Sequence, residues 1–106
     1  MRIIFDHNTP APLRYALLGH QVDTAYERGW AELTNGDLLT AAEAAGFELM
    51  ITTDKGIRYQ QNLTGRKLAL LVINTNDWTR IRKFKDLVTS EISSMQPGAY
   101  VEVEIP

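Results

Sequence analysis

Polar side chains that could take part in catalysis or metal binding follow three apolar runs of this sequence. They form the clusters Asp6–Asn8, Thr52–Lys55 and Asn74–Asp77, and a further acid, Asp37, begins an alanine-rich helical pattern. In an open parallel sheet, ligands bind outside the carboxyl ends of the strands. If the apolar runs are strands of one such sheet, we expect these clusters to meet at one edge of it.

Carboxylates gathered at that edge would favour a divalent cation. Neighbouring carboxylates repel one another in a partly dry site, and a hard cation relieves the repulsion. Magnesium and manganese prefer such oxygen ligands, and a carboxylate-held metal can activate water and stabilise a phosphoryl displacement. Acids after strands also serve as caps and turn residues. Asp37 in particular suits a first helical turn whatever the function, because the helix dipole favours an acid there.

The elements that must position these residues follow from the apolar pattern. Strands are predicted at 2–6, 21–25, 47–52, 68–73 and 99–105, and helices after Pro10 and at 38–45, 57–63 and 79–95. The first helix would carry its cap on Asn8 or Thr9 and an apolar stripe from Leu13 to Leu18. Because strands and helices alternate, we predict an α/β fold in three layers, with a central, mainly parallel sheet of about five strands. The last run alternates in polarity, which is typical of an edge strand.

Composition narrows the function class. The chain has 106 residues, which predicts a single domain over 1–106, and its formal net charge is −2. It has no cysteine, which excludes disulfides, thiolate zinc sites and a Cys nucleophile. The acid after the short run Ile3–Phe5 argues against a signal peptide or membrane span, so we expect a cytoplasmic protein. Local basic stretches, 55–67 and 80–85, leave nucleic acid open as a partner.

Several short motifs together resemble a known family. In chain order they are Ile4–Asn8 followed by Pro10 and a helix, Gly19–Val22, Gly36–Leu39 and Ile51–Lys55. Over about positions 1 to 75, their order and spacing resemble those of the PIN-like proteins found as toxin candidates in bacterial toxin–antitoxin modules.

The resemblance implies a PIN-like fold and a specific function. The protein would be a magnesium- or manganese-dependent endoribonuclease and the toxin-like component of a toxin–antitoxin module. A protein antitoxin would restrain it, and it could form a homodimer. Matched by position, Asp6, Asp37 and Asp54 would be the catalytic, metal-binding acids, and Asn8 would support Asp6. One departure stands out: the family often has a further acid two residues after the third, where this chain has Gly56.

RNA contacts are expected beside the third acid. Lys55 could meet a phosphate, and Arg58, Tyr59 and Gln61 combine a cation, an aromatic ring and an amide, which suits single-stranded RNA. The candidate substrate-binding residues are Asn8, Thr53, Lys55, Arg58 and Gln61. The alternative for this segment is an ordinary helix with Tyr59 packed inward.

Two other functions stay open. Gly56 motivates a non-catalytic PIN-like module that binds RNA or a protein partner after partial loss of the acidic site. An acid after one strand and a Thr and Lys after another also occur in flavodoxin-like phospho-acceptor domains. The single acid after the first strand argues against that class.

Overall fold

The computed structural model describes all residues, 1–106, and is built on one five-stranded parallel sheet. The strands lie in the order β2-β1-β3-β4-β5, and every neighbouring pair is parallel. Their bounds are β1 Arg2–Phe5, β2 Gln21–Thr24, β3 Leu49–Thr52, β4 Ala69–Ile73 and β5 Tyr100–Val103. The predicted α/β class and the predicted strand number and direction are confirmed.

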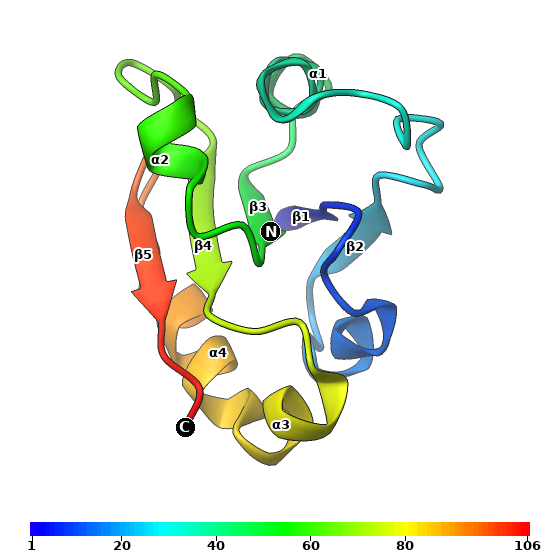
Figure 1. Cartoon of the computed structure of the whole chain (residues 1–106), viewed down its shortest axis with the longest axis vertical. Helices are drawn as coiled ribbons and strands as arrows, with labels where there is room; N and C mark the ends of the chain where they lie inside the picture. The colour runs from blue at the N-terminus through cyan, green and yellow to red at the C-terminus, as the bar shows by residue number, and fades with distance from the viewer.

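Helices cover both faces of the sheet and make three layers (Figure 1). One face carries α1 (Asn35–Ala44) and α2 (Ile57–Gln60). The other face carries the 3-10 helix η1 (Ala11–Ala16), α3 (Trp78–Lys83) and α4 (Lys85–Ser93). None of these helices is both long and apolar enough to cross a membrane.

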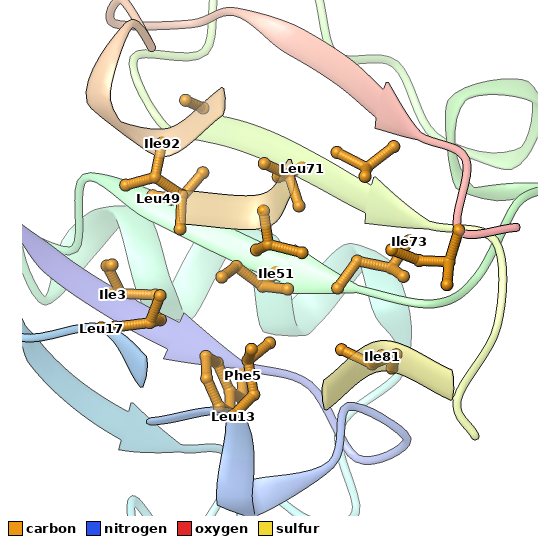
Figure 2. Packing of buried hydrophobic residues seen from close by; sticks show 14 residues of the cluster. Ile3, Phe5, Leu13, Leu17, Leu49, Ile51, Leu71, Ile73, Ile81 and Ile92 are labelled. Atoms are coloured by element: carbon orange, nitrogen blue, oxygen red, sulfur yellow. The ribbon is translucent and has the colours of Figure 1, made fainter. Parts of the chain in front are cut away.

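The two-residue period of the strands divides the core between the two faces. Alternate residues such as Phe5, Ile51 and Leu71 pack under η1, α3 and α4, as Figure 2 shows. Their neighbours, among them Ile4 and Met50, point to the opposite face and pack under α1 and α2. Every residue of β4 is buried, as expected for a central strand covered on both faces. β5 lies at an edge, as its alternating pattern predicted.

Three helical predictions differ from the structure. The helix expected at 57–63 ends at Gln60. The expected helix at 79–95 is split into α3 and α4 at Phe84, whose backbone (φ −125°, ψ 26°) leaves the helical region. The split lets α3 pack against η1 while α4 packs against β5. The segment after Pro10 is a 3-10 helix without a side-chain cap, so neither Asn8 nor Thr9 has the capping role predicted for it. Leu18 lies beyond its end and is 86% exposed instead of buried.

Candidate functional site

The carboxylate of Asp6 is the most buried acid at the carboxyl edge of the sheet. Asp6 directly follows β1 and is only 6% exposed. Its Oδ1 accepts hydrogen bonds from the backbone N–H of Thr9 at 3.1 Å and from the Thr9 hydroxyl at 2.6 Å. Its Oδ2 accepts a hydrogen bond from the Thr52 hydroxyl. A buried carboxylate needs such donors to offset its lost hydration, and the turn after β1 supplies two of them.

Thr52 links this acid to the end of the neighbouring strand. Phe5 of β1 pairs with Ile51 of β3, and the N–H of Asp6 donates to the Ile51 carbonyl at 3.2 Å. This register puts the Thr52 hydroxyl beside Asp6. The same hydroxyl oxygen accepts a hydrogen bond from the backbone N–H of Asp54 at 3.1 Å. One side chain therefore contacts the Asp6 carboxylate and the backbone that carries Asp54.

Asp54 is held in turn by the start of α1. Its Oδ2 accepts a hydrogen bond from Asn35 Nδ2 at 2.7 Å, and its Oδ1 accepts one from the N–H of Gly56 at 2.9 Å. Thr9, Asp6, Thr52, Asp54 and Asn35 thus form one connected set of polar groups, which we call the acid network. It draws on the ends of β1 and β3 and on the beginning of α1.

Asp37, the third predicted metal-binding acid, lies outside the acid network. It is exposed in the first turn of α1, and its backbone N–H donates to the capping hydroxyl of Thr34 at 3.4 Å. Its carboxylate makes no hydrogen bond or ion pair. No group of three or more His, Asp or Glu side chains lies close enough together to hold a metal ion. Through the Thr52 hydroxyl, the structure connects the Asp6 carboxylate to the backbone of Asp54, while Asp37 lies in solvent.

The third polar strand end is used for structure. The side chain of Asn74 bonds the segment after β5, accepting from the N–H of Ile105 at 2.8 Å and donating to Glu104 at 3.0 Å. Asp77 caps α3 by accepting from the N–H of Thr79 at 3.0 Å. This cluster adds no ligand to the acid network.

Some of the predicted substrate-binding residues are free in solvent, and others pack near the acid network. Asn8 and Lys55 are exposed and Thr53 is partly exposed, and none of their side chains makes a hydrogen bond or ion pair. The predicted support of Asp6 by Asn8 is wrong, because Thr9 provides it. Gln61 packs over the start of α1: a Cβ on Gly36 would lie 2.7 Å from Gln61 Oε1.

Arg58 turns away from Asp54 and toward β5. Its guanidinium lies over the rings of Tyr59, at 4.7 Å, and Tyr100, at 5.5 Å, and pairs with Glu102 at 3.3 Å. The hydrogen bond to Tyr59 raises the pKa of Arg58, and burial raises the pKa of Tyr100. The Tyr59 ring is 77% exposed, so the alternative of an inward-packed tyrosine is wrong.

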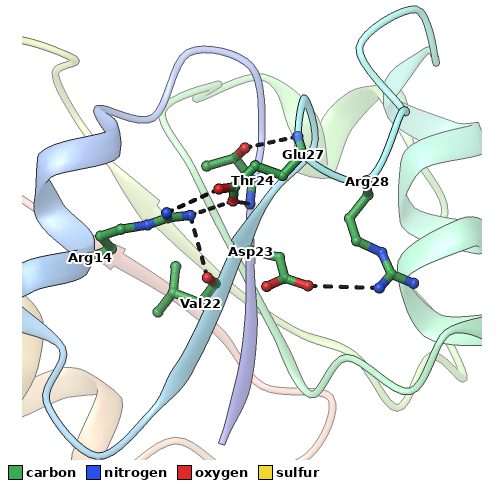
Figure 3. Close-up of polar contacts among 6 residues, drawn as sticks. All are labelled: Arg14, Val22, Asp23, Thr24, Glu27 and Arg28. Carbon is green, nitrogen blue, oxygen red and sulfur yellow. Dashed lines mark hydrogen bonds and ion pairs between the residues drawn. The ribbon is translucent and has the colours of Figure 1, made fainter.

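The acid whose pKa is shifted most, Glu27, lies outside the acid network. Arg14 of η1 donates two hydrogen bonds to Glu27, beyond β2, as Figure 3 shows. That pairing, with the backbone N–H of Thr24, lowers the pKa of Glu27 to about 2. Asp23 and Arg28 form a neighbouring ion pair at 3.7 Å. This cluster fastens η1 to the β2 edge and contains no residue of the acid network.

Residue-type reasoning missed the network's uncharged members. Thr9 was expected only as a cap and Thr52 only as part of a polar cluster, and Asn35 was not expected in the site. The signal that could identify Thr52 is the register of β3 against β1.

Comparison with known proteins gives no match: no family model, no curated protein and no solved structure matches this chain. The PIN-like resemblance therefore stays a prediction.

Proposed function

We propose that this protein is a magnesium- or manganese-dependent endoribonuclease whose centre is the acid network. The observation that supports the proposal best is the Thr52 hydroxyl, which bonds the Asp6 carboxylate and the Asp54 backbone at the carboxyl edge of a parallel sheet. Active sites of open α/β sheets lie at that edge. The motifs that resemble PIN-like proteins include the same two acids.

The donor set of the network fits a hard cation. Each ionised carboxylate offers about four lone pairs. Asp6 uses three of them and Asp54 two, so both keep free acceptor capacity. Magnesium is commonly held by one or two carboxylates, with waters and substrate phosphate completing the shell. Two aspartates are therefore sufficient, and a closed cage of three acids is not required.

Each residue would contribute in a definite way. Asp6 and Asp54 would hold the ion, which when bound supplies an activated water and offsets charge on the cleaved phosphate. Thr9 and Thr52 fix the orientation of the Asp6 carboxylate, and Asn35 fixes that of Asp54, as residues behind metal ligands do.

Residues at the rim would bind the substrate. Lys55, Thr53 and Gln61 would contact RNA beside Asp54, and a base would stack on the outward ring of Tyr59. Asp37 would bind the metal ion only if the start of α1 turned toward the acid network. The proposal also includes a cytoplasmic location and a protein antitoxin.

The direct test is cleavage of a labelled RNA with manganese or magnesium by the wild type and by Asp6→Asn and Asp54→Asn. We expect both variants to lose activity by at least about a hundredfold. Asp77→Asn is the matched control, because Asp77 caps a helix away from the network. Cleavage that survives both network substitutions contradicts the proposal.

Gly56 offers a test by gain of function. Its φ of −89° suits any residue, and a Cβ there would meet only the flexible Gln60 amide at 3.2 Å and Asp54 Oδ1 at 3.4 Å. We expect Gly56→Asp to tighten manganese binding about tenfold by adding a carboxylate beside Asp54. Gly56→Asn is the isosteric control. Equal affinities in calorimetry would argue against a cation beside Asp54.

The second candidate is a binding module without catalysis. It is favoured by the exposed position of Asp37 and by the hydrogen bonds that already engage Asp6. In this case RNA or a protein partner would bind at the same rim and no cleavage would occur. RNA binding that neither needs manganese nor changes with Asp54→Asn would support this candidate over the nuclease.

A further inference from the structure

The sheet face that carries η1, α3 and α4 has a groove that the acid network does not use. Two hollows of about 480 and 230 Å³ share the lining residues Tyr15, Ala16 and Lys85, so they adjoin one another, and together we call them the groove. The groove is lined by residues of η1, of the turn after it, and of α3 and α4, and both α3 and α4 contact η1. It contains no residue of the acid network, so binding there would not depend on the proposed nuclease activity.

The groove is apolar along its floor and at one rim. Leu17 and Ile92 are buried and line it from opposite sides. Tyr15 is 77% exposed and Leu18 is 86% exposed, although both are large and line the same hollow. Adjacent exposed apolar side chains around a groove are typical of a surface that binds another molecule.

The opposite rim is basic. Arg82 and Lys85 line the groove and take part in none of the ion pairs of the structure. Lys83, between them, is also exposed, and the segment 78–85 contains no acid. Asp86 is the single acid that lines the groove. In a chain whose net charge is −2, this concentration of unpaired cations is local.

We infer that this groove binds a peptide segment of a partner protein that combines acidic side chains with a large apolar one. The acidic groups would pair with Arg82 and Lys85, while the apolar side chain would enter the hollow between Leu18 and Ile92. Charge complementarity of this kind selects partners and orients them. A nucleic acid would satisfy the cations equally well and could stack a base on Tyr15, but it would leave the aliphatic side chain of Leu18 exposed to water.

The experiment is selection from a phage-displayed library of random short peptides against the full chain, with counter-selection on Lys85→Glu. Selected peptides are then synthesised with a fluorescent label and titrated by fluorescence polarisation. We expect them to be enriched in Asp or Glu together with Leu or Phe. Lys85→Glu and Leu18→Ser should each weaken binding by at least about tenfold, and added salt should weaken it further.

Matched controls separate the groove from general effects. Lys67→Glu reverses another exposed lysine outside the groove, and Leu87→Ser changes a leucine of α4 that is 44% exposed and lies outside it. Both should leave affinity unchanged, and thermal melting checks that all variants fold. RNA cleavage by Lys85→Glu should equal that of the wild type, which separates this inference from the nuclease proposal.

Three results would overturn the inference. The first is that selection yields no acidic apolar peptides. The second is that the selected peptides bind the wild type and Lys85→Glu equally. The third is that a labelled oligouridine loses affinity on Lys85→Glu while the peptides do not, which would make the groove an RNA surface.

Discussion

Asp6 and Asp37 are residues of the same type with opposite surroundings. Asp6 is 6% exposed, and its carboxylate accepts three hydrogen bonds from two threonines. Asp37 is exposed, and only its backbone makes a hydrogen bond, to Thr34. The strand end thus builds a fixed, desolvated carboxylate, whereas the helix start leaves a solvated one. Both acids were expected at the same edge of the sheet, so residue type and expected position cannot by themselves identify a site.

The largest expected difference between the two acids is in stability. Asp6→Ala leaves the buried Thr52 hydroxyl without an acceptor and removes the charged acceptor of the Thr9 N–H and hydroxyl, which keep only the backbone carbonyls of residue 6 and Ile51, so we expect the free energy of unfolding to fall by about 3 kcal/mol. Asp37→Ala removes only a favourable interaction with the helix dipole, which contributes about 0.5 kcal/mol. Urea unfolding followed by circular dichroism measures both. Equal losses would show that the network does not hold its strands together.

Thr52 gives the next largest effect. Thr52→Val keeps the shape of the side chain but removes the hydroxyl that bonds Asp6 and the Asp54 N–H, so we expect a loss of about 1–3 kcal/mol in the same assay. Thr53→Val is the neighbouring control, because the Thr53 side chain is partly exposed and makes no hydrogen bond, and its effect should stay within about 0.5 kcal/mol. A loss at Thr53 as large as at Thr52 would contradict a specific role for the Thr52 hydroxyl.

The sequence was sufficient for the fold and for part of the site. Apolar runs and their order predicted a parallel sheet because strands buried on both faces, such as β4, carry almost no polar residue. The break at Phe84 was not predictable, since the apolar spacing from Ile81 to Ile92 suits one straight helix equally well.

Within the site, the acids were visible from the sequence but their partners were not. The bond from Thr52 to Asp6 depends on the register of two strands 46 residues apart, and the contact of Asn35 with Asp54 depends on how α1 packs. Long-range geometry of this kind leaves no local pattern.

Asn35 and Asp37 lie two residues apart at the start of α1, and variants of the two test which side chain supports Asp54 in metal binding. Asn35 Nδ2 bonds Asp54 at 2.7 Å, so Asn35→Ala should weaken manganese binding about tenfold, the effect typical of residues behind metal ligands. Asp37→Ala should change it little. Isothermal calorimetry with the two variants decides between them. A larger loss for Asp37→Ala would mean that α1 turns Asp37 inward when the metal binds.

The smallest expected effect on stability is that of Glu27, an acid whose pKa is shifted although, unlike Asp6, it is not buried. Hydrogen bonds from Arg14 and from the Thr24 backbone lower its pKa to about 2, below its ordinary value of 4.5. A lowered pKa in the folded state means that the pair stabilises the protein above about pH 4.5, and that this contribution is lost as pH falls toward 2. The Glu27 side chain is 47% exposed, so solvent screening should keep the contribution below about 1 kcal/mol.

The stability difference between wild type and Glu27→Gln should therefore shrink as pH falls from 6 to about 2. Urea unfolding across this range measures it, and the carboxyl carbon shift of Glu27 in NMR gives the pKa directly. Asp23→Asn is the control, because its ion pair with Arg28 is longer, at 3.7 Å. A pKa near 4.5 for Glu27 would show that Arg14 does not hold it in solution. The attachment of η1 to the β2 edge would then depend on the hydrogen bond from Arg14 to the Val22 carbonyl and on the burial of Leu13 and Leu17.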